Sequence, residues 1–370
     1  MKILYLAIPY RLAGTKEKIG GGEISNRTLL EELAKKNEIH VFSAYGSGLW
    51  NEKVNGVEIY DLSEYLHWLG PLSVIFSKCV FRVLYYYKAI KLKPDIILCG
   101  PNAVSISVNI SKRLKVPSGC FIRAFENFES KGMNDHFGFK NIVKFLLYGN
   151  TKKTTINKLN FLLPNSEFMV RKCKEEFSCK YHHVVYPPIN VKRHSLYIPT
   201  KIKNIVMVSN SEHKGFEIFK DLSKIFNEIS FTAVGVQGIP DIEKLSKNLF
   251  LKGWQKDPKD FILNADLVLV PSKWEEPFGR IAVEALRYGR MVLVSNVGGL
   301  PETVNYNDSL VLESENLEAW VSKIKTLKEF TRIFEKEYHD AISKSEIFSL
   351  DTQVEALESF LKQLSHSTEC

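Results

Sequence analysis

The sequence predicts an α/β protein with two doubly wound parallel sheets, and three observations support this fold class. Short apolar runs alternate with helical patterns along almost the whole chain. The alternation stops over residues 187–203, a stretch without periodicity, and then restarts. At 370 residues the chain is longer than one hydrophobic core usually supports, so two domains are expected.

The first domain is expected to cover residues 1–187. Its apolar runs are expected to form buried parallel strands with amphipathic helices between them. The strands are expected at residues 2–9, 40–44, 57–60, 95–99, 118–122 and 161–164. The two longest helical patterns between them cover residues 23–36 and 69–91.

The second domain is expected to cover residues 188–349 and to hold a sheet of its own. Its strands are expected at residues 204–208, 231–236, 249–252, 267–270 and 291–295. A helix is expected to begin at Phe278 or Gly279 and to end at Gly289, because glycine readily adopts the left-handed conformation that terminates helices. Pro301 suits the first position of the next helix. The strand, helix and strand form a βαβ unit, whose crossover should be right-handed.

Charge is divided unevenly along the chain. Residues 1–190 hold 27 lysines and arginines against 16 aspartates and glutamates, whereas residues 191–370 hold 23 against 26. A basic first half suits an anionic membrane surface or a phosphate-bearing acceptor. A general richness in lysine explains the same numbers equally well. Nucleic acid is not expected as a partner.

The six cysteines are scattered, and no pair has the C-x-x-C spacing of a zinc or redox site, so no metal site is expected. Cys99 and Cys120 lie in apolar runs and are expected to be reduced core residues. The N-terminal run is interpreted as a first strand rather than a signal peptide, and no segment is apolar enough to span a bilayer. The expected location is therefore the cytoplasm.

Two segments combine aromatic and basic residues. In residues 69–91, five aromatic rings are interleaved with Lys78, Arg82 and Lys88. This pattern is typical of a helix at a membrane interface, and also of a core helix with a solvated basic side. Residues 141–160 are lysine-rich and amphipathic and are a second candidate for a membrane-facing surface, so the inner face of the membrane is included in the expected location.

Three positions suit an anionic ligand. Glycines occupy residues 20–22 at a helix start, where the backbone can approach a ligand and amide groups point at an anion; a flexible connection is the alternative. The helix start at residues 278–280 offers free N–H groups, and Lys214 opens another helix after a strand. In a parallel sheet these loops lie at the carboxyl ends of strands, where such folds bind ligands.

Two glutamates are unexpected beside a bound phosphate: Glu276 precedes the helix start and Glu284 follows it. Both are compatible with a phosphate if they accept hydrogen bonds from hydroxyl groups, since such charge-assisted bonds are worth about 1.5–3 kcal/mol each. A nucleotide sugar carries diols next to phosphates and matches the glutamates and the basic groups together. The alternatives are a solvated loop charge at Glu276 and an exposed helix position at Glu284.

These residues resemble the donor-binding domain of glycosyltransferase family 4, of the retaining, group 1 type. The resemblance rests on residues 276–279 with Glu284, on 271–272, on 298–302 and on 214–215. In the first domain, the residues at 21–23, 165–167 and 186–188 also match the family's order, so nearly the whole chain is covered. The resemblance implies the GT-B architecture, in which two Rossmann-like domains face each other across the active-site cleft. It also implies that the last helix, at about residues 350–370, packs back on the first domain.

The resemblance implies roles for individual residues. Glu284 would bind the ribose, Glu276 a hydroxyl of the donor sugar, and Lys214 the diphosphate. The remaining implied donor-site residues are Gly21, Gly22, Phe278, Gly279 and Arg280. Lys214 and Glu276 are the implied catalytic residues, because members of the family usually work without a metal and stabilise the leaving group with donors such as this lysine.

Two positions depart from the family pattern. Ser209 stands where many members have an arginine five residues before the lysine, so phosphate stabilisation would rely more on Lys214 and Arg280. The histidine that commonly follows a strand of the first domain is absent. Arg123 or Glu126 is expected to contact the acceptor in its place.

The leading hypothesis is a metal-independent hexosyltransferase that needs no obligatory cofactor. It would move a sugar from a UDP- or GDP-sugar to a glycan or lipid-linked acceptor in cell-surface polysaccharide biosynthesis. One alternative is a GT-B-type epimerase that acts on the sugar nucleotide alone, and another is a catalytically silent binding subunit of a glycan assembly complex. Trp254 and Trp274 are either core residues or stack on a base or sugar.

Overall fold

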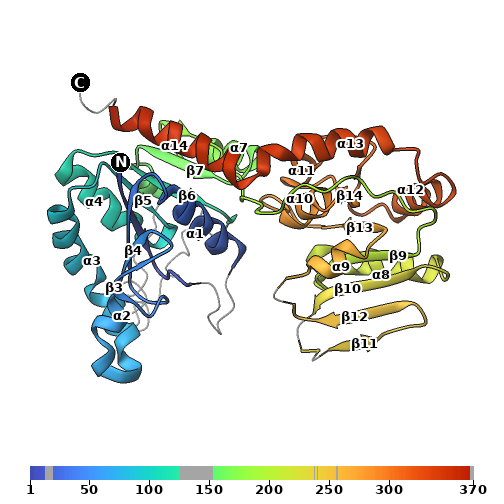
Figure 1. Ribbon diagram of the computed structural model, residues 1–370, viewed down its shortest axis with the longest axis horizontal. Helices are drawn as coiled ribbons and strands as arrows, with labels where there is room; N and C mark the ends of the chain where they lie inside the picture. Colours follow the sequence, from blue (N-terminus) through green and yellow to red (C-terminus); the bar gives the residue numbers. More distant parts are fainter. Residues whose placement is uncertain (13–19, 126–152, 237, 240, 256, 367–370) are drawn as a thin grey trace. The chain divides into compact units, whose positions relative to one another are not determined.

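The computed structural model describes residues 1–12, 20–125, 153–236, 238–239, 241–255 and 257–366. The chain divides into two compact units, Met1–Pro188 with Leu350–Cys370, and Ile189–Ser349. Each unit holds one mainly parallel sheet with helices packed on it (Figure 1). The expected α/β fold class with two such sheets is confirmed. No helix in the described parts of the chain combines the length and apolarity needed to cross a membrane.

The first sheet has eight strands in the order β3-β4-β2-β1-β5-β6-β7-β8. They are β1 (Lys2–Ala7), β2 (Glu38–Ser43), β3 (Trp50–Val54), β4 (Val57–Asp61), β5 (Ile96–Cys99), β6 (Ser118–Ile122), β7 (Phe161–Pro164) and β8 (Tyr181–His182). The pairings are parallel apart from that of β3 with β4. The strand order reverses at β1 and β5, and such a reversal places a ligand crevice at the carboxyl ends of the strands.

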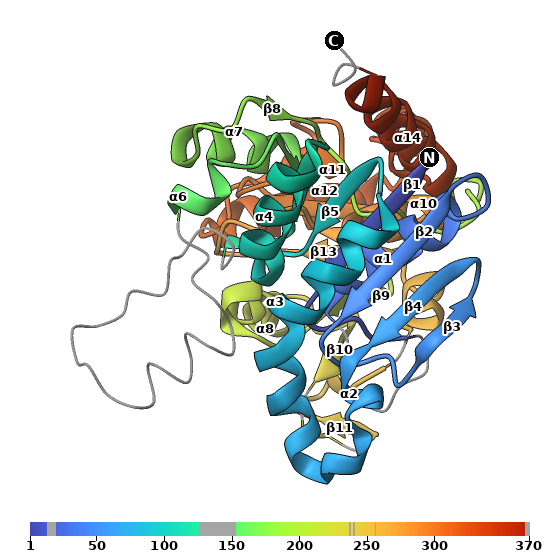
Figure 2. The same cartoon turned by 90° about the vertical axis from the view of Figure 1, so that its left-hand side faces the viewer.

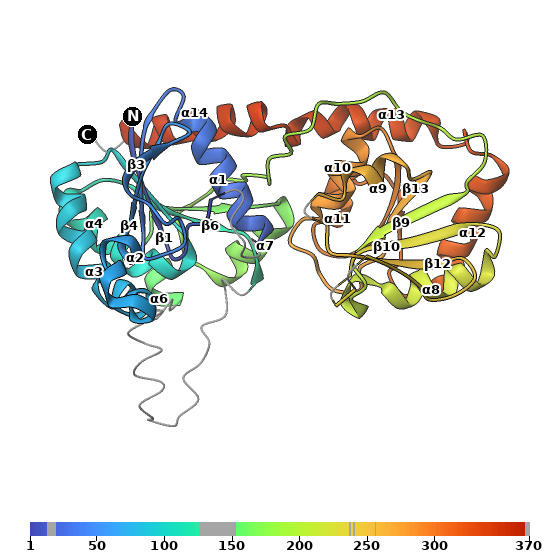
Figure 3. The same ribbon diagram turned by 60° about the horizontal axis from the view of Figure 1, so that its bottom comes forward.

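Side chains of β1 alternate between two hydrophobic cores, as the two-residue period of a strand requires. Ile3 and Tyr5 lie in the core that includes α1 and α14, whereas Leu4 and Leu6 lie in the core that includes α3, α4 and α7. These helices are α1 (Gly21–Leu33), α3 (Ser73–Leu92), α4 (Val104–Leu114), α7 (Glu167–Glu176) and α14 (Leu350–His366). Figure 2 shows α3 and α4 on the side turned to the viewer, and Figure 3 shows α14 passing close to α1.

Two helices of the first unit differ from the sequence expectation. α1 begins at Gly21 rather than at residue 23, so its first two residues are glycines. The long helix expected over residues 69–91 is interrupted at Gly70, whose φ of 56° is left-handed. A 3-10 helix, η1 (His67–Leu72), therefore precedes α3. The shorter helices of this unit are α2 (Leu62–Tyr65), η2 (Pro101–Ala103) and α6 (Lys153–Ile156).

The second sheet has seven strands in the order β11-β12-β10-β9-β13-β14-β15. They are β9 (Asn204–Val208), β10 (Ser230–Val236), β11 (Ile242–Lys244), β12 (Leu249–Gly253), β13 (Leu267–Val270), β14 (Met291–Ser295) and β15 (Val311–Leu312). Only the pairing of β11 with β12 is antiparallel among the described strands of this sheet. The order reverses at β9 and β13.

The helices of the second unit are η4 (Glu212–Lys214), α8 (Phe216–Ile225), α9 (Lys259–Leu263), α10 (Arg280–Arg287), α11 (Leu300–Thr303), α12 (Leu317–Glu329), α13 (Glu335–Lys344) and η5 (Ser345–Phe348). α10 buries its apolar side on the sheet, with Ala282, Ala285 and Leu286 fully buried. Its end is as expected from the sequence. Gly289 has a left-handed φ of 69°, and its N–H donates to the Leu286 carbonyl at 2.8 Å.

Candidate functional site

Two loops meet at the carboxyl ends of the central strands of the second sheet. The loop after β9 leads to Lys214, and the loop of residues 271–279 after β13 carries Glu276. Because β9 and β13 are neighbours where the strand order reverses, both loops lie at the place where such a sheet binds ligands. The loops are joined by their backbones, since the Lys273 N–H donates to the His213 carbonyl at 2.9 Å.

An ion pair stands where the loops meet. Lys214 Nζ lies 2.7 Å from Glu276 Oε1, and the Ser272 hydroxyl donates a hydrogen bond to the same oxygen. Glu276 is 7% exposed, so it is not a solvated loop charge. Within the described chain no hydrogen bond reaches Glu276 Oε2, which leaves this oxygen able to accept one from a ligand hydroxyl. The ring centroid of Trp274 lies 5.5 Å from Lys214 Nζ.

Glycines allow three backbones to approach one another around this ion pair. Gly215 has a φ of 82°, and a Cβ at this position would lie 1.8 Å from the Pro271 carbonyl oxygen. Gly298 has a φ of 60°, and its Cβ would lie 2.3 Å from the Glu276 carbonyl oxygen. The Gly299 N–H donates to that same oxygen at 2.7 Å. The glycines of these motifs therefore determine where the ion pair lies.

The helix α10 begins at Arg280, directly after this loop. Gly279 caps it with a φ of 115°, and a Cβ at Gly279 would lie 2.3 Å from Leu300 Cδ2. The first N–H groups of a helix have no partner within the helix and lie at the positive end of its dipole. The Phe278 side chain packs on Phe348 with ring centroids 5.2 Å apart, so it belongs to the core, and its backbone is the part near the helix start.

Glu284 and Arg280 form a second ion pair one turn into α10. Arg280 Nη2 lies 3.1 Å from Glu284 Oε1, and the Glu284 side chain is 16% exposed, so Glu284 is not an exposed helix position. Burial raises the pKa of Glu284 above its ordinary value, and the positive charge of Arg280 opposes this rise. Arg280, which was predicted to bind phosphate, is therefore paired with Glu284, which was predicted to bind the ribose.

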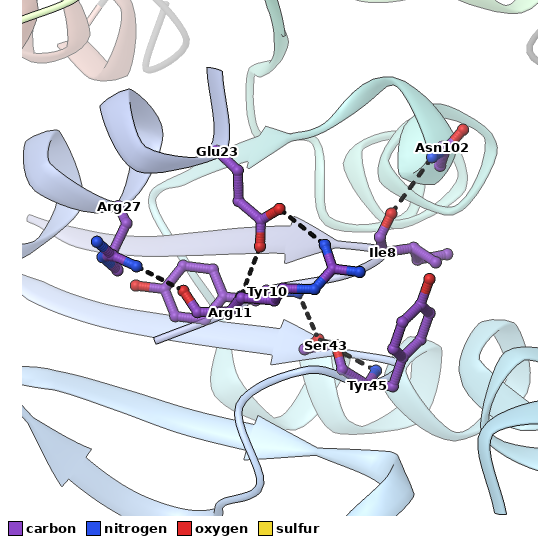
Figure 4. Close-up of polar contacts among 8 residues, drawn as sticks. All are labelled: Ile8, Tyr10, Arg11, Glu23, Arg27, Ser43, Tyr45 and Asn102. Carbon is purple, nitrogen blue, oxygen red and sulfur yellow. Dashed lines mark hydrogen bonds and ion pairs between the residues drawn. The ribbon is translucent and has the colours of Figure 1, made fainter. Parts of the chain in front are cut away.

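The predicted glycines Gly21 and Gly22 begin α1, which follows β1 at the carboxyl edge of the first sheet. Figure 4 shows the polar contacts of the neighbouring loop. Glu23 accepts a hydrogen bond from the Arg11 backbone N–H at 2.7 Å and pairs with Arg11 Nη1 at 3.0 Å. Burial raises the pKa of Glu23, and Arg11 opposes the rise. Arg27 donates to the Arg11 carbonyl at 2.8 Å. These contacts fasten the loop after β1 to the first turns of α1, which Gly21 and Gly22 begin.

The same loop is also tied to the ends of two neighbouring strands. The Tyr10 N–H donates to Ser43 Oγ at the end of β2 at 3.1 Å, and the Asn102 side chain after β5 donates to the Ile8 carbonyl at 3.3 Å (Figure 4). The chain directly after β1 is thus held by residues from three elements.

Arg123 follows β6, and its side chain makes hydrogen bonds within the first unit. Its Nε donates to Asn26 Oδ1 at 2.8 Å and its Nη1 to the Val185 carbonyl at 2.5 Å. A Cβ on Gly22 would lie 2.9 Å from Arg123 Cβ, so the glycine allows α1 to pack closely here. Arg123 therefore links α1 to the chain near Val185, and its contact with an acceptor stays a prediction. Glu126 lies outside the described residues.

Sequence reasoning gave no role to Ser272, although the structure places its hydroxyl on Glu276. A hydroxyl residue four positions before the glutamate was the available signal. The cysteines that the structure describes are free, as expected for Cys99 and Cys120. Nowhere in the described residues do three or more His, Cys, Asp or Glu side chains gather in a way that could hold a metal ion.

Comparison with known proteins identifies the domain that carries these ion pairs. Residues 191–346, nearly all of the second unit, match the family described as glycosyl transferases group 1. The second unit is therefore similar to group 1 glycosyl transferases over almost its whole length. An uncharacterized 42.6 kDa protein in the cps region of Klebsiella pneumoniae is 26% identical over 317 residues, which cover 77% of this chain and 83% of that protein.

Solved glycosyltransferase structures extend the likeness to both units of the chain. Sucrose-phosphate synthase from Thermosynechococcus elongatus has a TM-score of 0.72 at 15% identity, covering 99% of this chain and 100% of that one. HepE from Anabaena, solved with UDP-glucose, has a TM-score of 0.67 at 16% identity, covering 98% and 100%. The chain therefore has the GT-B fold class. Membership of the narrower family 4 stays a prediction.

Proposed function

We propose that this protein is a retaining glycosyltransferase that moves a hexosyl group from a nucleotide diphosphate sugar to a glycan or lipid-linked acceptor. The observation that carries the proposal is the Lys214–Glu276 ion pair at the strand-order reversal of the second sheet. It combines a cation for the leaving diphosphate with a carboxylate that can accept a hydrogen bond from a sugar hydroxyl.

Lys214 is the proposed partner of the diphosphate. Its ammonium group is a compact charge on a flexible stem, and its side chain is one-third exposed, so it can turn from Glu276 toward a bound phosphate. Glu276 then keeps the Ser272 hydroxyl on Oε1 and accepts a donor hydroxyl on Oε2. A lysine in this place stabilises the charge that develops as the diphosphate leaves, which is why we propose a reaction without an obligatory metal or cofactor.

The start of α10 is the proposed seat of the phosphates, with the amides of Phe278 and Gly279 beside them. Glu284 is assigned to the ribose hydroxyls, and Arg280 holds its carboxylate in place until the nucleotide binds. Gly21 and Gly22 of the first unit remain assigned to donor binding, near the phosphate or the acceptor.

Relatives support the choice of donor and process. HepE was solved with UDP and with UDP-glucose, so a UDP-sugar is the first donor to test and a GDP-sugar the second. Two Klebsiella relatives are proteins of a cps region, which supports a part in the biosynthesis of a cell-surface polysaccharide. We place the reaction in the cytoplasm at the inner face of the membrane, where the basic first unit meets anionic lipid and a lipid-linked acceptor.

A thermal-shift panel of nucleotides and nucleotide sugars tests the donor site. A ligand at 100 times its dissociation constant should stabilise the protein by about 2.7 kcal/mol. Lys214→Ala and Glu276→Gln should reduce the shift, because they remove the diphosphate and sugar contacts. Lys328→Ala is the control, since it removes a cation that pairs with Glu228 elsewhere in the same unit. The proposal fails if no nucleotide shifts the melting temperature.

Product analysis separates transfer from its alternatives. With donor and acceptor present, the product should keep the donor's anomeric configuration by NMR. A new sugar nucleotide formed without acceptor would indicate an epimerase instead. If glycan production needs the protein but is unaffected by Lys214→Ala and Glu276→Ala, the chain serves as a binding subunit.

A further inference from the structure

The helix α3 exposes an apolar side along its whole length. Its opposite side is buried on the first sheet, through Phe81, Tyr85 and Ala89. A helix that is apolar all round is normally buried on every side. Here Val83 and Tyr87 are 63% and 64% exposed. The exposed apolar residues, which we call the apolar strip, are Leu72 at the end of η1 and Ile75, Phe76, Val83, Leu84 and Tyr87 in α3.

Aromatic residues extend the apolar strip at the start of α3. Trp68 in η1 is 72% exposed and Tyr65 in α2 is also exposed. In Figure 2, α2 lies at the end of α3 that is lowest in the view. Because α3 connects the end of β4 to the start of β5, this aromatic end lies at the carboxyl edge of the first sheet, the edge that also carries Arg11 and Glu23.

The lysines of α3 are not part of the apolar strip. Lys88 Nζ lies 3.1 Å from the ring centroid of Tyr60, and Lys78 Nζ lies 4.8 Å from that of Tyr45. Both ammonium groups therefore rest on aromatic rings of the unit itself. The reading of α3 as a core helix with a solvated basic side is wrong for these two lysines, since its exposed side is apolar.

The sequence that holds α3 and α4 carries little negative charge. Between residues 66 and 125 the sequence holds nine lysines and arginines and one carboxylate, Asp95. Exposed cations gather where α3 and α4 end, at the amino edge of the sheet. They are Lys91, Lys93, Lys112, Arg113 and Lys115. Glu64, beside Tyr65 in α2, is an exposed carboxylate at the edge of this surface. A surface that pairs apolar and aromatic side chains with several cations and few carboxylates matches an anionic lipid surface.

We propose that the apolar strip, with Tyr65 and Trp68, docks on an anionic membrane. The helix lies in the interface with its apolar side among the lipid chains, and the cations at its end contact the headgroups. Lipid fits better than a protein partner, because tryptophan and tyrosine favour the membrane interface and no carboxylate interrupts the region from Leu66 to Pro94. If the proposed function holds, docking also brings the carboxyl edge of the first sheet close to a lipid-linked acceptor.

Vesicle co-sedimentation tests this docking with the full chain and no nucleotide. Binding is expected to vesicles of phosphatidylcholine with phosphatidylglycerol, and much less to phosphatidylcholine alone. It should weaken as salt rises, since salt screens the lysine contacts. Trp68→Glu and Val83→Glu should each weaken partition about tenfold or more, and Lys91→Ala or Lys112→Ala about fivefold.

Matched variants make the test specific. Phe330→Glu changes an equally exposed apolar residue of the second unit and should bind like the wild type. Glu276→Gln should also bind normally while losing its response to nucleotide, so failure of docking and failure of the proposed function give different results. Docking is refuted if Trp68→Glu binds anionic vesicles as well as the wild type. It is equally refuted if light scattering shows a dimer that Trp68→Glu dissociates, because the strip would then be a protein interface.

Discussion

Glu284 combines a cost to stability with a proposed benefit to binding. Burial raises its pKa, so the folded state holds a proton more tightly than the unfolded chain does. The wild type should therefore lose stability as pH rises from the ordinary glutamate pKa through the raised one. Glu284→Gln should remove this loss, so its melting temperature relative to the wild type should be higher at pH 7 than at pH 4.

Glu228→Gln provides a control of opposite sign. A hydrogen bond and ion pair with Lys328 lower the pKa of Glu228, so this substitution should cost more stability at pH 7 than at pH 4. Equal pH trends in the two variants would contradict the assignment of burial as the cause at Glu284.

The same Glu284→Gln substitution should weaken nucleotide binding. An amide accepts a ribose hydroxyl less strongly than a carboxylate does, by about 1–2 kcal/mol, or roughly five- to thirtyfold. Titration calorimetry with UDP measures the change. A variant with unchanged affinity would show that the carboxylate does not contact the ribose.

At the scale of elements, the packing of the Glu276 loop, residues 271–279, is predicted to depend on Gly298. Residue 298 has a left-handed backbone conformation, which is unfavourable for alanine. The alanine Cβ would also lie 2.3 Å from the Glu276 carbonyl oxygen, so the two loops would have to separate. Gly298→Ala should cost about 3 kcal/mol or more of unfolding free energy and reduce nucleotide binding. Denaturant unfolding measures the first and calorimetry the second.

Gly238→Ala is the matched control for this loop. Gly238 has a φ of 81°, and no atom of the described residues lies within 4 Å of the added Cβ, so only the backbone strain of about 1–2 kcal/mol is expected. Similar losses in both variants would mean that close contact with the Glu276 loop contributes nothing.

At the scale of the whole molecule, α14 completes the unit that holds the N-terminus. Leu357 is fully buried with the leucines of α1, and Gln353 accepts a hydrogen bond from the Tyr186 N–H at 2.7 Å. Leu357→Ala should destabilise the first unit by about 2–5 kcal/mol, and Glu355→Ala, at an exposed site, by little. Calorimetry should show the second unit's transition, recognised by its shift with UDP, unchanged. A fall in that transition would contradict the separate stability of the two units.

Much of the fold follows from local pattern. The buried strands, the restart of alternation after residue 203 and the end of α10 at Gly289 were predictable, because strand burial and helix termination depend on residues close in sequence. Polar edge strands could not be predicted in the same way. Most side chains of β3 are exposed, so its sequence lacks the apolar alternation that marks a strand. Periodicity predicted one helix over residues 69–91, but the chain is interrupted at Gly70.

The sequence by itself determined the fold class and the chemical groups of the donor site, because both depend on patterns of residues that are close together in the chain. Only the tertiary structure decided which groups meet: Lys214 with Glu276 and Ser272, Arg280 with Glu284, and Arg123 with Asn26. It also decided that the apolar strip of α3 is exposed. In α3 apolar side chains occur on both sides of the helix, so the sequence pattern did not show which side is exposed. Residues far apart in sequence meet only through strand order.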